Sequence, residues 1–528
     1  MSEKLFDIEK HNIFCYDPEL RTWKQLLQGH DENGKFAGMK YIQTNNKELH
    51  GKFILPGFID AHCHLLENPY PNDSNAEGRS IPSIALYNAL IAAQSGITSL
   101  KDMGGYEYKA IEILKMLANF KVPRLFSSGC YFTVPDGHCS DRGAIIIHDL
   151  NNFTTALKRL LDNEIKFCKI INSDNGFSLE LLSKMINYAH EKGMMVSCHA
   201  YTEKAARVAV EAGTDTLEHA GNYSEELINL ILKNRVIVVP TYVAAVDSTP
   251  ENCKDISGVD ASVLREWING ENMVIPKLIK HGVRIALGTD SGFLGTPCDS
   301  LLREVELLHK NFNISIPELL YFAIVITPMT VGMKGKLGLI EDGYYADCLC
   351  YDENPLEDIE VLTKPKEVWV NGNRIDEAIQ NKTVIRRLAK KDIQMLTVHI
   401  KQSFFDCAGL DDFWTDDEIE NWINDPNDYC AGAFVEGRLI GFCLTHHHKT
   451  ANKVHIENIF VDYMYREKGI AQYLIFDVIT HYRSVFSKVR FVGLVDVTNK
   501  KSVDLLLRNN FTKGHPMLWM QYNSYERL

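Results

Sequence analysis

The pattern of hydrophobic and polar residues changes several times along the chain, and each change predicts a different unit. Up to about Gly51 the sequence is polar, with short apolar runs and turns such as Glu32-Asn33-Gly34, which predicts a small β element. From Gly338 to Asp376 the chain is again rich in strand-like runs, with turns at Asp342-Gly343 and Asn371-Gly372. These two flanks enclose a longer region with a different pattern.

Between Phe53 and Ile326, apolar runs typical of strands alternate with stretches of helical spacing. Ile97 to Leu100 predicts a strand, Leu179 to His190 a helix, and Met194 to Cys198 the next strand. Strands that alternate with helices over roughly 250 residues predict a parallel α/β barrel or a doubly wound sheet. Beyond it, a basic stretch from Lys382 to Lys391 predicts a linker, and an independent α/β segment follows.

Composition narrows the class of protein. The hydrophobic content of 45% and charged content of 24% are typical of a soluble globular chain, and the net charge of −13 argues against a general nucleic-acid binder. We find no signal-peptide pattern and no apolar stretch of the roughly 20 residues that cross a bilayer, so we expect no membrane partner. The 13 cysteines follow no regular spacing, which predicts reduced thiols and a cytoplasmic location.

The most informative stretch runs from Leu55 to Leu65 and contains His62 and His64. It predicts a short buried strand with two histidines at its C-terminal end. Because alternation along a strand places residues i and i+2 on one face, both histidines can point at one metal ion while Cys63 turns away. Taken alone, the pair has a simpler interpretation as two polar residues that end a strand.

Other ionisable residues also stand at predicted strand ends in this region: Lys169, His199, His219 and Asp290. The C-terminal ends of parallel barrel strands open on one face, where active sites lie. Four histidines and one aspartate suit zinc or a similar ion. Each residue alone has a structural interpretation, such as a snorkelling side chain for Lys169 or turn formation for Asp290. The series in chain order favours a metal site.

These residues belong to a larger set of segments: Pro56 to His64, Lys169, His199, Glu218 to Ala220, Leu287 to Asp290, Gly338 to Asp347 and Val368 to Gly372. The set resembles the amidohydrolase superfamily over about residues 1–385. The resemblance implies a (β/α)8 TIM barrel from 56 to 335 and a small flanking β-sandwich built from residues 1–55 and 336–385.

The resemblance also implies ligands for two divalent ions, expected to be zinc: His62, His64 and Asp290 for one, His199 and His219 for the other. Lys169, carboxylated on its amine, would bridge them, because a carbamate offers anionic oxygens and an ammonium offers none. Lys166 competes for this role, but a single lysine inside an apolar strand end fits it better. Two such ions lower the pKa of water, and Asp290 would pass the proton to the leaving amine.

Within the superfamily, His199-Ala200-Tyr201 and Asp136-Gly137-His138 resemble a prolidase-like and Xaa-Arg dipeptidase-like group, which more usually has Gly-Gly-His. The resemblance implies that His138 polarises the scissile carbonyl and that Tyr201 contacts the substrate carboxylate. Structural roles for both residues are the alternative. The expected substrate is a small molecule, either a dipeptide or an N-acyl amino acid. Imidazolone-type or other cyclic amides are an alternative, and deacetylation of small N-acetylated compounds is a further one. A homo-oligomer is compatible with this interpretation.

In the C-terminal segment, Ile456 to Asp462 predicts a strand, and Arg466 to Ala471 opens a helix. Backbone N–H groups at a glycine-containing helix start bind phosphate. This order, with Gly493 to Asn499 and Asn510-Phe511, resembles GNAT-type N-acetyltransferases over about residues 393–528. The resemblance implies an α+β domain that binds acetyl-CoA, with contacts expected from Arg466, Lys468, Gly469, Ile470, Ala471 and Asn499.

Glu457 on the predicted strand is a candidate base for the acceptor amine, and equally a structural surface carboxylate. The family often places a tyrosine shortly before a Gly-Phe pair, but here Leu505 to Leu507 fill that stretch and Asn510 replaces the glycine. A bifunctional hydrolase and acetyltransferase is therefore weighed against a hydrolase with a non-catalytic acyl-CoA-binding module. His446 to His448 could form a metal tract, but a solvated turn is the preferred interpretation.

Overall fold

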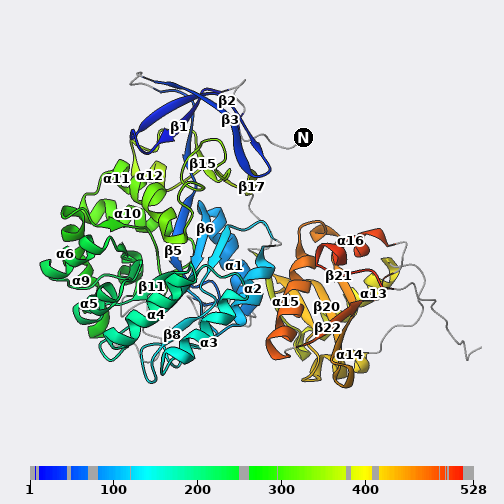
Figure 1. The fold of residues 1–528 in the computed structure, drawn as a ribbon. Coiled ribbons are helices and arrows are strands. Elements are labelled where there is room, and N and C mark those ends of the chain that lie inside the picture. Colours follow the sequence, from blue (N-terminus) through cyan, green and yellow to red (C-terminus); the bar gives the residue numbers. More distant parts are fainter. Residues whose placement is uncertain are drawn as a thin grey trace, which may run out of the picture. The chain divides into compact units, whose positions relative to one another are not determined.

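The structure of the protein is a computed structural model that divides into two compact units, residues 1–384 and 385–528. Figure 1 shows the helices and strands of both units. The described residues are 6, 11–44, 49–68, 81–118, 120–248, 261–293, 295–375, 382–406, 416–486, 488–493, 495 and 499–514.

Both flanks of the first unit build one seven-stranded sheet in the order β17-β16-β15-β4-β1-β2-β3. Its strands are β1 (Ile13–Asp17), β2 (Thr22–Glu32), β3 (Lys35–Gln43), β4 (Lys52–Pro56), β15 (Cys348–Tyr351), β16 (Glu367–Val370) and β17 (Asn373–Ile375). The start of β3 returns to the second flank, where Phe36 donates its backbone N–H to Tyr344 at 2.9 Å. Phe36 and Trp369 lie in the same buried cluster, so residues from both flanks share one core.

The strands between these flanks form a parallel barrel. They are β5 (Phe58–Cys63), β6 (Ile97–Asp102), β7 (Arg124–Ser127), β8 (Tyr131–Thr133), β10 (Phe167–Ile171), β11 (Met195–His199), β12 (Thr216–Glu218), β13 (Ile237–Val239) and β14 (Arg284–Ile285), with the short β9 (Ile145–Ile146) beside β8. The third barrel position is divided between β7 and β8. The chain after β14 meets β5, since Ala61 donates its N–H to Leu287 at 2.9 Å. The predicted α/β barrel is confirmed.

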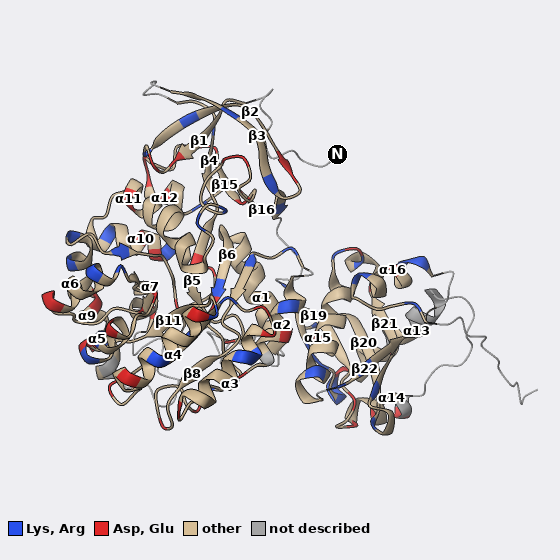
Figure 2. Ribbon diagram, in the orientation of Figure 1, with Lys and Arg blue, Asp and Glu red and all other residues tan. Residues whose placement is uncertain are grey.

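Helices follow the strands on the outside of the barrel (Figure 1). They are α1 (Ile81–Gln94), α2 (Lys109–Leu117), α3 (Leu150–Leu161), α4 (Leu179–Glu191), α5 (Glu203–Ala212), α6 (Glu225–Asn234), α7 (Tyr242–Asp247), α9 (Ala261–Lys280) and α10 (Leu301–Phe312); α11 (Ile316–Tyr321) and α12 (Ile359–Leu362) come later. Ser178, Thr202 and Ser224 each accept a backbone hydrogen bond as N-caps, which starts α4, α5 and α6 directly after strand-end loops. Basic and acidic positions are interspersed along these helices (Figure 2).

The second unit has a five-stranded sheet in the order β18-β19-β20-β21-β22, whose last pair is parallel. Its strands are β18 (Val384–Arg387), β19 (Ala431–Val435), β20 (Arg438–His448), β21 (Lys453–Val461) and β22 (Arg490–Gly493). Its helices are α13 (Ile393–Asp406), α14 (Asp416–Asn424), α15 (Ile470–Val485) and α16 (Lys500–Arg508). Helix α15 connects β21 to β22, and α13 and α15 both contact the sheet.

Two local predictions in this unit are wrong. The stretch from 382 to 391 contains β18, an edge strand of the sheet, instead of forming a linker throughout. His446 to His448 form the end of β20 rather than a turn, because they pair with β21 in an antiparallel ladder. The polar side chains concealed this strand, since only His447 among the three is buried.

Every cysteine among the described residues is free. Within the same residues, the structure contains no helix with the length and hydrophobicity that crossing a bilayer requires.

Candidate active site

His62, His64 and Asp290 come together at the C-terminal end of the barrel. His62 lies in β5, whose residues are all buried, and His64 follows it. The Nε2 atoms of both histidines lie 3.2 Å from the same oxygen of Asp290, Oδ1. The ligand atoms of the three residues lie within 4.8 Å of one another. This geometry suits a shared cation, since two imidazoles and one carboxylate converge on one point.

The backbone turns Asp290 and His219 toward the barrel mouth. Asp290 has a φ of 55° and His219 a φ of 69°, a left-handed conformation that non-glycine residues seldom adopt. Backbone hydrogen bonds hold both residues, from Asp290 N–H to His62 at 2.7 Å and from His219 N–H to Val239 at 2.8 Å. Local strain of this kind is typical of functional sites.

His199 and His219 form a second pair beside this group. Their ring centroids lie 4.6 Å apart, and the ring of His219 lies 5.0 Å from that of His62. Burial lowers the pKa of His199 well below its ordinary value and lowers the pKa of His219 to about 3. Both imidazoles are therefore neutral at pH 7, which is the form that can bind a metal ion.

Three of the histidines are oriented through Nδ1. His62 Nδ1 donates to Glu218 Oε2 at 2.8 Å, and His64 Nδ1 donates to the Gly104 carbonyl at 3.1 Å. His219 Nδ1 lies 2.8 Å from Thr241 Oγ1, an oxygen that itself donates to the Pro240 carbonyl. Because Nδ1 carries the proton, Nε2 presents its lone pair, as metal-binding histidines do.

These partners of the histidines were not predicted from the sequence. Glu218 was visible only as the residue before His219, and alternation along β12 predicts that the two side chains point apart. The positive φ of His219 interrupts that alternation, so Glu218 and His219 both contact the cluster through His62.

Lys169 lies in β10, and its residue is 2% exposed. Among the described residues its Nζ finds no hydrogen-bond partner. Burial lowers the pKa of this amine, with the carboxylates of Glu218 and Asp290 opposing that shift. The competitor Lys166 is exposed, outside the strand. Carboxylation would convert a buried amine of this kind into an anionic metal ligand, so the residues present fit the divalent ions expected for this cluster.

His138 contacts this cluster, whereas Tyr201 lies against α9 and Gly221. The ring of His138 stacks on that of His199 with centroids 4.9 Å apart, and its backbone carbonyl accepts a hydrogen bond from Thr133 Oγ1 at 3.1 Å. Tyr201 follows β11, and its hydroxyl lies against Gly270 of α9, where an added Cβ would be 3.3 Å away. Burial raises the pKa of Tyr201 to about 12, so this hydroxyl keeps its proton at neutral pH.

The predicted acetyl-CoA residues of the second unit lie around the start of α15. Gly469 has a φ of 79° and immediately precedes the helix, with Ile470 and Ala471 in the first turn. The Arg466 Nε donates to the Val461 carbonyl at 2.7 Å, and Lys468 is exposed. Backbone N–H groups at the start of a helix are the groups that bind a phosphate in proteins.

Two other predicted residues of this unit, Asn499 and Glu457, lie outside the start of α15. Asn499 accepts a hydrogen bond from Ser502 N–H at 3.1 Å as the N-cap of α16, and Glu457 lies on β21 with its side chain 34% exposed. Asn510 has a φ of 64°. Asparagine tolerates this conformation better than most residues, which explains how it can stand where the resembled family has glycine.

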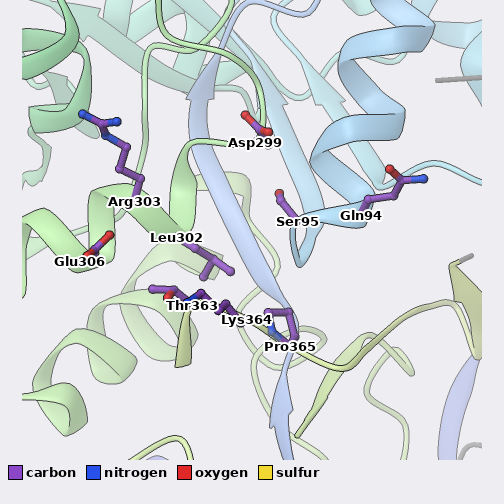
Figure 3. Close-up of a pocket in the computed structure, with 9 residues that line it drawn as sticks. All are labelled: Gln94, Ser95, Asp299, Leu302, Arg303, Glu306, Thr363, Lys364 and Pro365. Carbon is purple, nitrogen blue, oxygen red and sulfur yellow. The ribbon is translucent and has the colours of Figure 1, made fainter. Parts of the chain in front are cut away.

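A separate cavity of 360 Å³ lies between the end of α1, helix α10 and the chain from Thr363 to Pro365 (Figure 3). Its polar lining includes Asp299, Arg303 and Glu306. None of its lining residues belongs to the predicted site.

Comparison with known proteins assigns the first unit. Residues 53–375 match the model of the amidohydrolase family. The chain belongs to the amidohydrolase family. This amidohydrolase also contains a segment of a second family, since residues 393–511 match the acetyltransferase (GNAT) family. Both families predicted from the sequence are confirmed, and with them an enzyme of the hydrolase class.

Individual relatives are distant. The ochratoxinase of Aspergillus niger is 24% identical over 379 residues, covering 63% of this chain and 78% of that protein. A solved putative prolidase from Bifidobacterium longum has a TM-score of 0.59 at 24% identity, covering 69% of this chain and 93% of the prolidase. A solved Xaa-Pro dipeptidase with bound methionine has a TM-score of 0.60 at 20% identity, with 69% and 98% covered. At these identities the structural likeness shows the fold.

Proposed function

We propose that the barrel is a binuclear metal-dependent hydrolase of amide bonds in dipeptides or N-acyl amino acids. The observation that carries the proposal is Lys169, a buried amine without a hydrogen-bond partner in the described residues, in the same barrel as the buried histidine cluster. An ammonium buried in this way costs free energy unless something compensates it. Reaction of the neutral amine with carbon dioxide, with release of one proton, would give an anionic carbamate, and bound cations would stabilise it.

The proposed ligands are His62, His64 and Asp290 for one ion and His199 and His219 for the other, with Lys169 between them. When bound, such ions lower the pKa of a water molecule and polarise a carbonyl oxygen. The contacts of Asp290 through Oδ1 with both histidines leave its second oxygen, Oδ2, to carry a proton to the leaving amine. Burial and the charge of Arg142 lower the pKa of His138, which keeps its imidazole neutral and able to donate one hydrogen bond to the scissile carbonyl.

The names of the similar proteins support the substrate class. Two solved neighbours are a putative prolidase and a Xaa-Pro dipeptidase, whose substrates end in a free carboxylate. In this chain the protonated hydroxyl of Tyr201 is the group proposed to donate to that carboxylate. A deacetylase of small N-acetylated compounds is the alternative that uses the same site.

A substrate panel tests the proposal. The zinc-loaded protein is assayed against dipeptides and N-acyl amino acids, with release of the free amino acid as the readout. We expect hydrolysis by the wild type and its loss in His64→Ala, while His190→Ala remains active because His190 pairs with Asp215 outside the cluster. Hydrolysis of N-acetyl compounds alone would favour the deacetylase, and an active His64→Ala variant would contradict the metal site.

We further propose that the second unit binds acetyl-CoA on the first turn of α15 and transfers the acetyl group to an amine, with Glu457 as base. Support comes from the left-handed Gly469 and from the exposed side chain of Glu457 on β21. Leu505 to Leu507 favour a second candidate, an acyl-CoA-binding module without transfer, because they occupy the stretch where a tyrosine acid is usual.

Binding and turnover must therefore be measured separately. Calorimetric titration with acetyl-CoA measures binding, and release of free thiol in the presence of a panel of amines measures transfer. We expect Glu457→Gln to retain binding and to lose transfer. Binding by the wild type without transfer to any amine would leave the binding module as the function of this unit.

A further inference from the structure

Strands β20 and β21 present a row of histidine and carboxylate side chains on one face of the second unit's sheet. The ladder pairs His446 with His455 and His448 with Lys453. His447 points the other way, since its ring lies 4.4 Å from that of Phe486, just beyond α15. Alternation therefore places His446 and His448 on the face opposite His447.

On that face, His448, His455 and Glu457 offer ligand atoms that all lie within 4.8 Å of one another. The rings of His448 and His455 have centroids 4.7 Å apart, and His455 Nδ1 lies 3.8 Å from Glu457 Oε1. The Nε2 of His455 is buried and has no hydrogen-bond partner among the described residues. Three donors thus converge, and one of them is an unsatisfied nitrogen.

We propose that His448, His455 and Glu457 bind one divalent transition-metal ion, with zinc as the best match. The two proposed roles of Glu457 belong to different states of this unit, because its carboxylate can act as a base only when it does not bind the ion. Two imidazoles and a carboxylate are ligands that zinc prefers, and three protein ligands leave a fourth position for water or a small ligand. The paired strands hold the donors, so binding requires little reorganisation. The site is separate from the barrel cluster because all three residues belong to the second unit.

Two neighbours define the ligand set. His446 Nδ1 pairs with Asp428 Oδ2 at 2.8 Å, and His446 is not a member of the convergent group. Lys453 lies opposite His448 and supplies no ligand, while its positive charge opposes a cation nearby. Lys453→Ala is therefore a matched control that changes the same surface without removing a ligand.

The test measures zinc uptake by the full chain in equilibrium dialysis, with elemental analysis of the dialysed protein. We compare the wild type, His448→Ala/His455→Ala, Lys453→Ala, and the barrel variant His62→Ala/His64→Ala. We expect the C-terminal double variant to bind one zinc ion fewer than the wild type and Lys453→Ala to bind the same number. Adding His448→Ala and His455→Ala to the barrel variant should lower its zinc content by one further ion.

This design separates the two metal sites. If the barrel binds no zinc, the wild type should still bind one zinc ion more than His448→Ala/His455→Ala. Equal uptake by these two chains over the whole zinc titration overturns the C-terminal site. The single variant His448→Ala removes only an exposed side chain, so it keeps the test valid if the double variant does not fold, and it should weaken zinc binding at least tenfold.

Discussion

Replacing Lys169 by methionine should make the metal-free protein more stable and the enzyme inactive. Lys169 is 2% exposed and its Nζ has no hydrogen-bond partner among the described residues, so the folded protein without metal contains a buried amine that lacks a hydrogen bond. Methionine is similar in length and carries no polar group. The same substitution removes the proposed ligand between the two ions. Stability and activity therefore change in opposite directions, which a purely structural lysine would not produce.

The magnitudes follow from these contacts. Relieving a buried unsatisfied polar group regains about 1 to 3 kcal/mol, and a shape-conserving exchange in a core costs less than about 1.5 kcal/mol. We therefore expect a net gain of about 1 kcal/mol in the free energy of unfolding of the metal-free protein. Ion-based stabilisation of a transition state is worth several kcal/mol, so kcat/KM should fall by about a thousandfold or more.

The assay compares Lys169→Met with Lys166→Met, which replaces the exposed neighbour. Unfolding is followed in chelator and in buffer free of bicarbonate, and hydrolysis is measured after zinc loading. Because burial lowers the pKa of Lys169, the metal-free wild type should gain stability as pH rises toward about 10.4, the ordinary lysine pKa. The variant should lack this gain. A less stable metal-free variant, or one with full zinc content and activity, refutes the reasoning.

Three further predictions concern the surroundings of the site and the second unit. Glu218→Gln should weaken zinc binding by about 10- to 100-fold in a competition titration, because it removes the acceptor of His62 Nδ1. Gly292→Ala should lower zinc content and activity, because an added Cβ overlaps the His64 carbonyl at a φ of 92°. Burial lowers the pKa of His481 to about 4. The folded protein therefore keeps its full stability above a pH of about 6.5, the ordinary histidine pKa, and loses stability as the pH falls from there toward about 4. Between pH 7.5 and pH 5, the free energy of unfolding of His481→Phe should therefore fall by about 2 kcal/mol less than that of the wild type, as measured by urea denaturation.

Each of these predictions has its own control. Glu203→Gln alters a half-exposed carboxylate at the start of α5 and should leave zinc affinity unchanged. Gly193→Ala has the same kind of positive φ, 72°, but nothing lies within 4 Å of its added Cβ, so zinc content should be normal. The His481 prediction depends on the stacking with Tyr429, at 3.8 Å between centroids, which phenylalanine preserves. Identical pH dependence in the wild type and His481→Phe would contradict it.

Much of the fold could be predicted because its signals are local. Strand β11 and helix α4 lie within a residue of their predicted limits, since alternating apolar runs and N-caps such as Ser178 act over a few positions. The end of β20 could not be predicted in this way. Its histidines read as polar and solvated, and they form a strand because β21 supplies hydrogen-bond partners from farther along the chain.

The sequence by itself determined the identity and order of the candidate ligands, the families of both units and the strand that carries His62. Only the tertiary structure decided how those ligands are oriented. Glu218 contacts His62 across 156 positions of sequence, and Asp290, which has a positive φ, points its carboxylate at two histidines at the end of β5. Such contacts depend on closure of the barrel and on single backbone dihedrals. The physical reason is that residue type sets which chemistry is available, while long-range packing sets where each atom lies.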